Sequence, residues 1–271
     1  MVTTSDTAFS GSIPEIYDRL LVPLIFDDYA RDLAQNVEKL RPRAVLEIAA
    51  GTGVVTRAMA ACLPGGTCQV ATDLNPAMLD YAKAKQPADG QVEWRQADAL
   101  NLPFANNTFD IVVCQFGAMF FPDKVRAYSE AHRVLRTGGH FIFSVWDRIS
   151  ENEFADTITN ALAAHFPADT PHFLARTPHG YHDSAKIRSD LNRAGFTRIA
   201  IEVVKHTSKA SSPRVPATAY CQGTPLRAEI EAREPSGLQA VTDYAAAALA
   251  QRFGSDAVEG RIQAIVVTAS G

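Results

Sequence analysis

The segment Val45–Gly53 places an acidic side chain directly before a turn of small residues. Glu47 follows a short apolar run, and Gly51 and Gly53 stand in the turn, after which a helix-forming run continues from Val54 to Cys62. Small residues let a backbone approach a ligand closely. A carboxylate beside such a turn repels a pyrophosphate, the usual ligand of a glycine turn that opens a helix, and attracts an ammonium group. The segment predicts a strand, loop and helix that bind a ligand with a cationic amino group.

Two further acids follow predicted strands in the same way. Asp73 ends the run from Cys68, and a carboxylate there accepts hydrogen bonds from both hydroxyls of a ribose. Asp98 and Ala99 follow the run 91–96, where a carboxylate accepts a hydrogen bond from an adenine amino group. S-adenosylmethionine satisfies all three acids, since it has an ammonium, a ribose and an adenine but no phosphate.

A dinucleotide such as NAD is the competing ligand for this kind of fold. Gly51 and Gly53 match the first two glycines of the G-x-G-x-x-G fingerprint, but Thr56 stands where the third is required. The pair Tyr81 and Lys85 has the spacing of an oxidoreductase catalytic pair, although it falls on the wrong helix. These departures and Glu47 disfavour an NAD-type oxidoreductase.

The three acids and the glycine turn follow one another in a fixed order along the chain: Glu47, Gly51, Gly53, Asp73 and Asp98-Ala99. This ordered set resembles the class I S-adenosylmethionine-dependent methyltransferases, and within them the small-molecule enzymes of ubiquinone and menaquinone biosynthesis. Further matches are Leu100 with Pro103-Phe104, then Phe109–Val113 and Arg133–His140. Ala49 and Thr137 depart from the family, which commonly has glycine and proline there. The resemblance and the spacing together imply cofactor contacts from Tyr17, Glu47, Ala49, Gly51, Thr52, Gly53, Asp73, Leu74, Met78, Asp98, Ala99, Gln115 and Phe116.

The predicted elements alternate between strand and helix, which indicates an α/β fold. We expect a Rossmann-like, doubly wound seven-stranded sheet, mostly parallel with an antiparallel final strand, plus a helical cap. Residues 1–40 form an N-terminal helical segment over the cofactor in this interpretation, and 41–271 form the methyltransferase domain with cap insertions near 150–183 and 208–236. Pro213 and Pro216 make 208–222 look like a loop. Asp110 begins a strand, away from the ligand edge, and is assigned a structural role.

The residues that carry the reaction are less specified than those that bind the cofactor. A sulfonium is already a good leaving group, so the protein has to align the acceptor and exclude water. Gln115 and Phe116, at the end of the fourth predicted strand, are candidates for the acceptor site, as are His179 and His182. The two histidines are spaced like metal ligands but lack a clear third ligand, so no metal is predicted.

The composition of the chain limits the classes of molecule that we expect it to bind. The chain has 271 residues, 46% hydrophobic residues and a formal net charge of −4, and it has no run of lysine and arginine. Nucleic acid is therefore disfavoured as a partner, and a small-molecule acceptor is favoured. The four cysteines form no C-x-x-C pair, the first twelve residues lack an apolar signal core, and no run is long enough to span a membrane. We expect a cytoplasmic protein, with a homodimer as one possible state.

The most specific hypothesis is an enzyme that transfers a methyl group from S-adenosylmethionine to a small molecule by in-line displacement. A protein that binds the cofactor without transferring the methyl group is the alternative, and an NAD-type oxidoreductase is a more distant one. The sequence specifies neither the acceptor nor the atom that is methylated.

Overall fold

A computed structural model describes residues 11–86 and 92–271 of the chain. Internal contacts divide these residues into two compact units. The helical unit comprises 11–27, Trp146–Tyr181 and Val204–Ala264, and the sheet unit comprises Asp28–Val145, His182–Val203 and Ile265–Gly271. No helix among the described residues is both long enough and apolar enough to cross a membrane.

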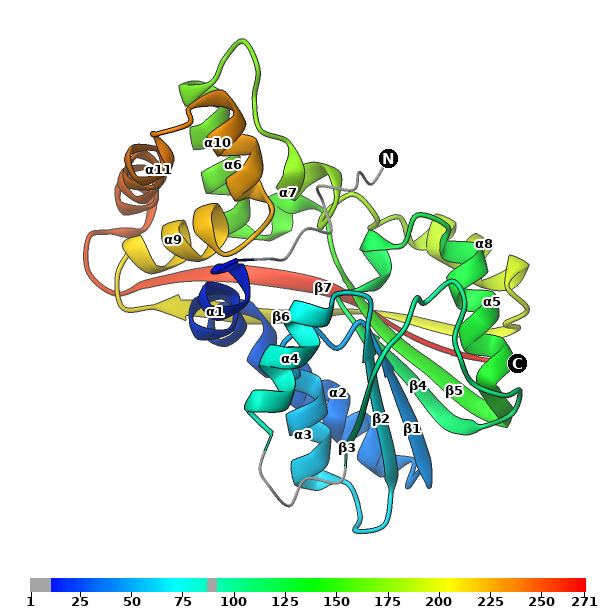
Figure 1. Cartoon of the computed structure of the whole chain (residues 1–271). Coiled ribbons are helices and arrows are strands. Elements are labelled where there is room, and N and C mark those ends of the chain that lie inside the picture. The colour runs from blue at the N-terminus through cyan, green and yellow to red at the C-terminus, as the bar shows by residue number, and fades with distance from the viewer. Residues whose placement is uncertain (1–10, 87–91) are drawn as a thin grey trace. The chain divides into compact units, whose positions relative to one another are not determined.

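A seven-stranded sheet with the order β3-β2-β1-β4-β5-β7-β6 organises the fold (Figure 1). Its strands are β1 (Ala44–Ile48), β2 (Cys68–Asp73), β3 (Val92–Gln96), β4 (Phe109–Gln115), β5 (Leu135–Trp146), β6 (Arg198–Ala210) and β7 (Val258–Ser270). The first five pair in parallel. The expected Rossmann-like fold with an antiparallel final pair is confirmed.

The antiparallel direction of β6 and β7 is visible in contacts at both ends of the pair. Arg198, at the start of β6, donates from Nε to Ser270 Oγ at 3.1 Å, near the end of β7. Lys209, near the end of β6, forms an ion pair of 2.9 Å with Glu259, near the start of β7. Each of these two strands begins in one unit and ends in the other.

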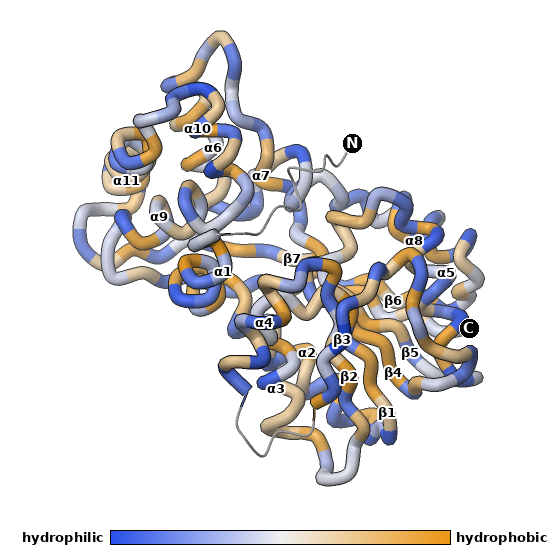
Figure 2. The backbone as a smooth tube through the Cα atoms, viewed as in Figure 1, coloured by the Kyte–Doolittle hydropathy of each residue, from blue (hydrophilic) through white to orange (hydrophobic). Residues whose placement is uncertain are grey.

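Helices cover both faces of the sheet within the sheet unit. They are α2 (Asp27–Lys39), α3 (Val54–Cys62), α4 (Pro76–Ala84), α5 (Lys124–Val134) and α8 (Ser184–Arg193). Leu33 of α2 and Met59 of α3 pack with Val45 and Ile142 on one face. On the other face, Tyr128 of α5 lies 5.2 Å from the ring of Phe143, centroid to centroid. Because helices cover both faces, side chains on both faces of β1 and β4 are buried, and most residues of these two strands are hydrophobic (Figure 2).

The helical unit packs its helices around a core of its own. It contains α1 (Ile13–Ile16), η4 (Ile149–Glu151), α6 (Glu153–His165), α7 (Phe173–Arg176), α9 (Arg214–Gln222), α10 (Leu226–Arg233) and α11 (Leu238–Phe253). Phe154 of α6 meets Phe253 of α11 edge to face at 5.1 Å. The prediction of a loop over 208–222 was wrong, because α9 occupies most of that segment. Pro213 precedes the helix and Pro216 lies in its first turn, where a missing N–H leaves no hydrogen bond unmade.

A π-helix, η2 (Tyr17–Phe26), follows α1 and contains Pro23. The N–H of Asp27 donates to the carbonyl of Val22, five residues back, which is the π-type pattern. A proline inside an α-helix usually interrupts it, because proline cannot supply the N–H of an α-helical turn. Here Pro23 lies inside the wider π-helix.

Asp110 holds the amino-terminal edge of the sheet together. Its Oδ2 accepts hydrogen bonds from the N–H groups of Arg43 and Ala44 at 2.7 and 2.9 Å, and its Oδ1 accepts one from Arg136. The structural role assigned to this acid is confirmed.

Helix α5 fastens the long segment that follows β3. Arg126 Nε donates to the Leu100 carbonyl at 2.9 Å, and Glu130 Oε2 accepts from the Leu102 N–H at 2.8 Å. Arg133 donates to the carbonyls of Leu102 and Phe104 and to Glu130. The Arg133 guanidinium also holds the pKa of Glu130 below its usual value. These three side chains lie on one face of α5 and fix the segment that carries Asp98.

Replacing Glu130 with alanine should therefore destabilise the protein. The change leaves the N–H of Leu102 and part of the Arg133 guanidinium without an acceptor, and Glu130 is only 4% exposed. We expect a loss of about 2–3 kcal/mol in the free energy of unfolding, measured by urea denaturation. Glu38→Ala, at an exposed position of α2, should stay within about 0.5 kcal/mol of the parent protein. Equal stabilities of the two variants would contradict the role assigned to α5.

Candidate functional site

The chain leaves β1 through a loop whose backbone is held in an unusual conformation. Ala49, Gly51 and Gly53 have φ angles of 56°, 57° and 81°, a left-handed region that favours glycine. The N–H of Ala50 donates to the Thr72 carbonyl at the end of β2, at 2.9 Å. The loop is therefore anchored to the neighbouring strand before α3 begins.

Gly53 is needed for a close approach as well as for its φ angle. A Cβ at this position would lie 2.9 Å from Cη2 of Trp94, a residue of β3. The indole ring therefore occupies the space beside the loop, and its Nε1 donates to Gln86 Oε1. Sequence reasoning did not single out Trp94, because its part in supporting the loop depends on the pairing of β2 with β3.

Asp73 joins the end of β2 to the glycine loop. Its Oδ2 accepts from the N–H of Gly51 and its Oδ1 from the N–H of Asn75, both at 2.8 Å. Burial raises the pKa of this carboxyl above its usual value. Each carboxylate oxygen has two lone pairs, so both can accept a further hydrogen bond.

The helix after Asp73 begins with a side-chain cap. Asn75 Oδ1 accepts from the N–H of Ala77 at 2.9 Å, and Pro76 occupies the first position of α4. Leu74 is 56% exposed, an uncommon position for an apolar side chain, whereas Met78 is 4% exposed and packs in the core. Leu74 thus presents an apolar surface beside Asp73.

Asp98 and Ala99 form a tight turn after β3. Asp98 is exposed, and its Oδ1 accepts from the N–H of Leu100 at 2.9 Å, while Ala99 is buried. Arg126, Glu130 and Arg133, which fix this segment, were missed by the sequence analysis. Their spacing of four and three residues on a predicted helix is the signal that could have identified them as one face.

Glu47 is buried on the face of β1 that packs against α3. It is 2% exposed, and its Oε2 accepts a hydrogen bond of 2.5 Å from Thr56 Oγ1. Burial raises the pKa of Glu47 to about 8, with the Thr56 bond opposing the shift and the nearby Asp73 adding to it. Thr56, which departs from the dinucleotide fingerprint, therefore serves as the hydrogen-bond partner of this acid.

The end of β4 carries a second backbone of unusual conformation. Phe116 has a φ of 53°, which is costly for an aromatic residue. Its N–H donates to the Ser144 carbonyl at 3.0 Å, and its ring meets Tyr29 edge to face at 5.3 Å. These contacts hold Phe116 in place, with Gln115 before it at the end of the strand.

Gly117 brings this segment into contact with the loop after β1. A Cβ on Gly117 would lie 2.5 Å from Cβ of Ala49 and 2.8 Å from Sγ of Cys114. The alanine that departs from the family pattern is thus matched by a glycine across the contact. Because β1 lies between β2 and β4, the three loops converge at the carboxyl-terminal edge of these parallel strands, where ligands bind in such sheets.

The other predicted residues lie in both units. Tyr17, in the helical unit, stacks on Phe26 with 5.3 Å between ring centroids. His179 is buried in the helical unit, where its Nδ1 lies 2.8 Å from the Asp147 carbonyl oxygen, while His182 belongs to the sheet unit. Contacts of these three with a cofactor or acceptor stay predictions.

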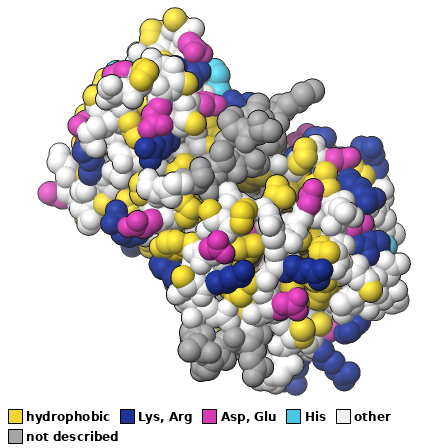
Figure 3. Space-filling model, viewed as in Figure 1, with side chains coloured by type: hydrophobic (Ala, Val, Ile, Leu, Met, Phe, Trp, Pro, Cys, Tyr) yellow, Lys and Arg dark blue, Asp and Glu magenta, His cyan; other side chains and the backbone are white. Residues whose placement is uncertain are grey.

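The distribution of charged and metal-ligating side chains can be described for part of the molecule. On the face that Figure 3 shows, basic and acidic side chains of the described residues are interspersed. Within 11–86 and 92–271, no three side chains of histidine, cysteine, aspartate or glutamate gather in a group that could hold a metal ion.

Known proteins share both the sequence pattern and the fold. Residues 46–143 match the model of the methyltransferase domain family. The chain is 38% identical over 102 residues to the demethylmenaquinone methyltransferase of Thermus thermophilus, covering 37% of this chain and 46% of that protein. It is 36% identical over 140 residues to a ubiquinone/menaquinone biosynthesis C-methyltransferase of Klebsiella pneumoniae, covering 50% and 52%.

A solved structure extends the similarity to most of the chain. The YcgJ protein of a Bacillus species has a TM-score of 0.56 and 18% identity, with coverage of 89% of this chain and 97% of that one. The fold and the family resemblance are confirmed by these matches. The chain spans about half the length of the curated relatives it matches.

The contact between Gly117 and Ala49 predicts a compensating pair of substitutions. Gly117→Ala should lower the free energy of unfolding by about 1–3 kcal/mol, because the added methyl overlaps Ala49 and Cys114. Adding Ala49→Gly should recover at least half of that loss, since it removes the shorter overlap. Urea denaturation of both single variants and the double variant measures the coupling. Strictly additive effects would show that the two positions do not touch.

The raised pKa of Glu47 predicts that the free energy of unfolding falls as the pH rises towards 8. The folded protein holds this proton up to about pH 8, whereas the ordinary carboxyl titrates at 4.5, so between these values only the folded state is protonated. The contribution of Glu47 to the free energy of unfolding is therefore fully present below pH 4.5 and is lost as the pH rises through 8. Glu47→Gln should flatten this decline. The loss of unfolding free energy between low pH and pH 8 should be smaller in the variant than in the parent protein, by at most about 5 kcal/mol.

Thermal or urea unfolding from pH 5 to 8 measures the effect. Glu202→Gln, at an exposed position of β6, is the matched control and should leave the pH dependence unchanged. Parallel profiles for Glu47→Gln and the parent protein would mean that Glu47 titrates normally.

Proposed function

We propose that this chain, whose residues 46–143 carry a class I methyltransferase domain, transfers a methyl group from S-adenosylmethionine to a small-molecule acceptor. The observation that carries the proposal is the joined pair of loops in which Asp73 holds Gly51 and still has lone pairs for a ribose. The sulfonium of the cofactor supplies an activated methyl group, so the protein contributes binding, alignment and exclusion of water.

The described residues fit this cofactor. Thr52, inside the glycine loop, is 1% exposed, and its Oγ1 has no hydrogen-bond partner among the described residues. A buried hydroxyl of this kind is expected to find a partner, which a ligand seated on the loop could supply. A Cβ on Gly51 would meet no atom within 4 Å, so a ligand could approach the loop backbone at this residue.

Each acid has a distinct proposed task. Asp73 would accept the ribose hydroxyls, and Asp98 would accept the adenine amino group beside the apolar surface of Leu74. Glu47 would bind the ammonium group of the cofactor, directly or through water, because a nearby cation stabilises the ionised form of the carboxyl group. Cofactor binding would then release the proton that burial retains on Glu47.

The same residues argue against a dinucleotide. A pyrophosphate on this loop would face two carboxyl groups, those of Glu47 and Asp73, whose burial already disfavours further negative charge. Thr56 points its hydroxyl at Glu47 instead of leaving the open backbone that a third glycine provides.

The acceptor class is the finer part of the proposal. The names of the relatives point to quinone-derived aromatic acceptors, and we propose an acceptor of that lipophilic kind. The family match ends at residue 143, whereas His179 and the helices α9 to α11 lie beyond it. We propose that acceptor choice depends in part on these segments outside the family match.

Calorimetric titration with S-adenosylhomocysteine tests the cofactor, with NAD and NADP as controls. We expect binding of S-adenosylhomocysteine alone. Asp73→Asn should weaken it by about 1–3 kcal/mol, or roughly 5- to 150-fold, through loss of charge-assisted hydrogen bonds to the ribose. The asparagine keeps an acceptor for only one of the two backbone N–H groups, those of Gly51 and Asn75, so urea denaturation of the variant is needed to separate a binding effect from loss of the loop structure.

Asp80→Ala is the matched control, because Asp80 is exposed on α4 and contacts neither loop in the proposed site. Its affinity should equal that of the parent protein. Binding of NAD in place of S-adenosylhomocysteine, or full affinity in Asp73→Asn, would overturn the assignment.

A further inference from the structure

A cavity of about 230 Å³ lies at the amino-terminal edge of the sheet, where β4 and β5 begin. All the residues around it belong to the sheet unit. Along β4, Asp110 at the cavity lies five positions before Gln115 of the candidate site, about 17 Å at the rise of an extended strand. The cavity is therefore separate from the proposed cofactor contacts. Its lining residues are Leu40, Pro42, Asp110, Ile111 and the segment from Arg136 to His140.

An irregularity in the pairing of β4 with β5 leaves room for the cavity. Phe109 pairs with Leu135. The next pair is Ile111 with His140, so one residue of β4 lies opposite four residues of β5. Gly138, one of these four, has a φ of 81°, and a Cβ on it would meet no atom within 4 Å. The extra residues of this bulge interrupt the ladder and leave open space beside the backbone.

The Arg136 guanidinium has hydrogen-bond donors to spare at this cavity. Its Nη1 donates to Asp110 Oδ1 at 2.7 Å, whereas its Nε and Nη2 have no partner among residues 11–86 and 92–271. The side chain is 45% exposed, so a ligand can reach these groups. A guanidinium presents its N–H groups in a planar fork that matches the two oxygens of a carboxylate. Arg136 can therefore bind a second carboxylate while it keeps its bond to Asp110.

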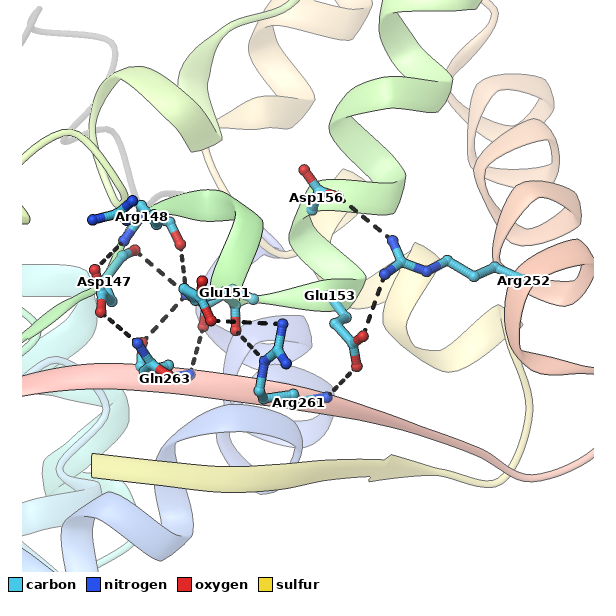
Figure 4. Close-up of polar contacts among 9 residues, drawn as sticks. Asp147, Arg148, Glu151, Glu153, Asp156, Arg252, Arg261 and Gln263 are labelled. Atoms are coloured by element: carbon cyan, nitrogen blue, oxygen red, sulfur yellow. Dashed lines mark hydrogen bonds and ion pairs between the residues drawn. The ribbon is translucent and has the colours of Figure 1, made fainter. Parts of the chain in front are cut away.

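An arginine of the helical unit shows the opposite arrangement (Figure 4). Arg252 Nη1 lies 3.5 Å from Asp156 Oδ2, and its Nη2 lies 3.3 Å from Glu153 Oε1. Nη1 also donates to Thr157 Oγ1 at 3.0 Å. Two carboxylates and a hydroxyl thus share the donors of Arg252, which fastens α11 to α6. Arg136 has a single partner of this kind, so fastening of one element to another does not use all its donors.

The surrounding charges favour an anion in spite of Asp110. Both oxygens of Asp110 already accept hydrogen bonds, Oδ1 from Arg136 and Oδ2 from two backbone N–H groups at the start of β1. The segment 38–43, which supplies Leu40 and Pro42, carries one exposed acid and three exposed bases: Glu38, Lys39, Arg41 and Arg43. These residues and the Arg136–Asp110 pair have a net positive charge, although the chain as a whole is negative. A local positive charge attracts anions to this edge.

The size and the apolar lining of the cavity limit the ligand further. Leu40 is 44% exposed and lines the cavity together with Pro42 and Ile111. A ligand that covers this leucine removes apolar surface from water, which favours binding. The volume is below the range of roughly 300–1,000 Å³ that is usual for sites of drug-sized ligands. The ligand that fits is therefore a small molecule with an apolar body and one carboxylate.

We propose that this cavity binds a small monocarboxylate with an apolar body, such as an aromatic acid, and that Arg136 holds its carboxylate. Leu40 and Ile111 contact the apolar body. Binding is non-covalent and involves the sheet unit alone. The site goes beyond the proposed methyl transfer and does not rest on it.

Two probes that differ in charge test the inference. Calorimetry on the full chain compares benzoate with benzamide, which has the same ring but no negative charge. We expect the parent protein to bind benzoate about tenfold more tightly, the effect of hydrogen bonds between charged groups. Arg136→Met should remove most of this preference. Arg31→Met, at an exposed arginine that also pairs with an aspartate of the sheet unit, should retain it.

A second variant covers the case in which Arg136→Met fails to fold. Leu40→Glu changes an exposed side chain, and the new carboxylate should weaken benzoate binding about fivefold through charge repulsion. Val203→Glu is the matched control, because Val203 is 54% exposed on β6 and does not line the cavity. Its affinity for benzoate should equal that of the parent protein.

An NMR titration locates the bound probe. His140→Gln assigns the imidazole signals of His140, and benzoate should shift these signals in the parent protein. Absence of a shift, equal affinities for benzoate and benzamide, or full benzoate affinity in Leu40→Glu would overturn the inference. Inorganic phosphate that binds as tightly as benzoate would also overturn it, because the site would then recognise phosphate.

The cofactor assignment is tested separately. S-adenosylhomocysteine carries a carboxylate of its own, so benzoate is also titrated in its presence. We expect an unchanged benzoate affinity, whereas competition would place benzoate at the cofactor contacts and overturn the inference. If S-adenosylhomocysteine does not bind but Arg136→Met removes the preference for benzoate, the proposed methyl transfer fails and the carboxylate site stands.

Discussion

The close approach of two backbone segments at the end of β1 and β4 is the constraint on which the candidate site depends. Ala49 and Gly117 touch across this edge, and Asp73 ties the same loop to β2 through Gly51. Backbone at such an edge has no regular partner and must be held by side chains or by strained conformations. The positive φ values of Ala49 and Phe116 show that the backbone is strained at this edge of the sheet.

Two buried acids lie beside the glycine loop. Burial raises the pKa of both Glu47 and Asp73, and hydrogen bonds from Thr56 Oγ1 and from backbone N–H groups hold the two carboxyl groups in place. Because Glu47 keeps its proton up to about pH 8, a cation placed beside it would favour the loss of that proton.

Local sequence signals were sufficient for the sheet unit but not for its supports. Asn75 and Pro76 marked the start of α4, and Glu47 with Gly51 marked the loop, since each signal acts within a few residues. Trp94 supports the glycine loop from a neighbouring strand, so no local pattern reveals it. The loop predicted from Pro213 and Pro216 was wrong, because proline breaks the interior of a helix but is tolerated before its start and in its first turn, where these two residues lie. The sequence-predicted roles of Tyr17, His179 and His182 stay predictions.

The extent of the family match bears on how the proposed cofactor and acceptor contacts are divided along the chain. The match over residues 46–143 includes the carboxyl-terminal ends of β1, β2 and β3 with the loops that follow them, which carry the proposed cofactor contacts Glu47, Asp73 and Asp98. A cofactor that brings its own leaving group requires the same binding and alignment from every protein that uses it. Gln115 and Phe116, the candidates for the acceptor site at the end of β4, lie inside the match, whereas His179 lies outside it. The candidates for acceptor recognition therefore fall on both sides of the boundary of the match.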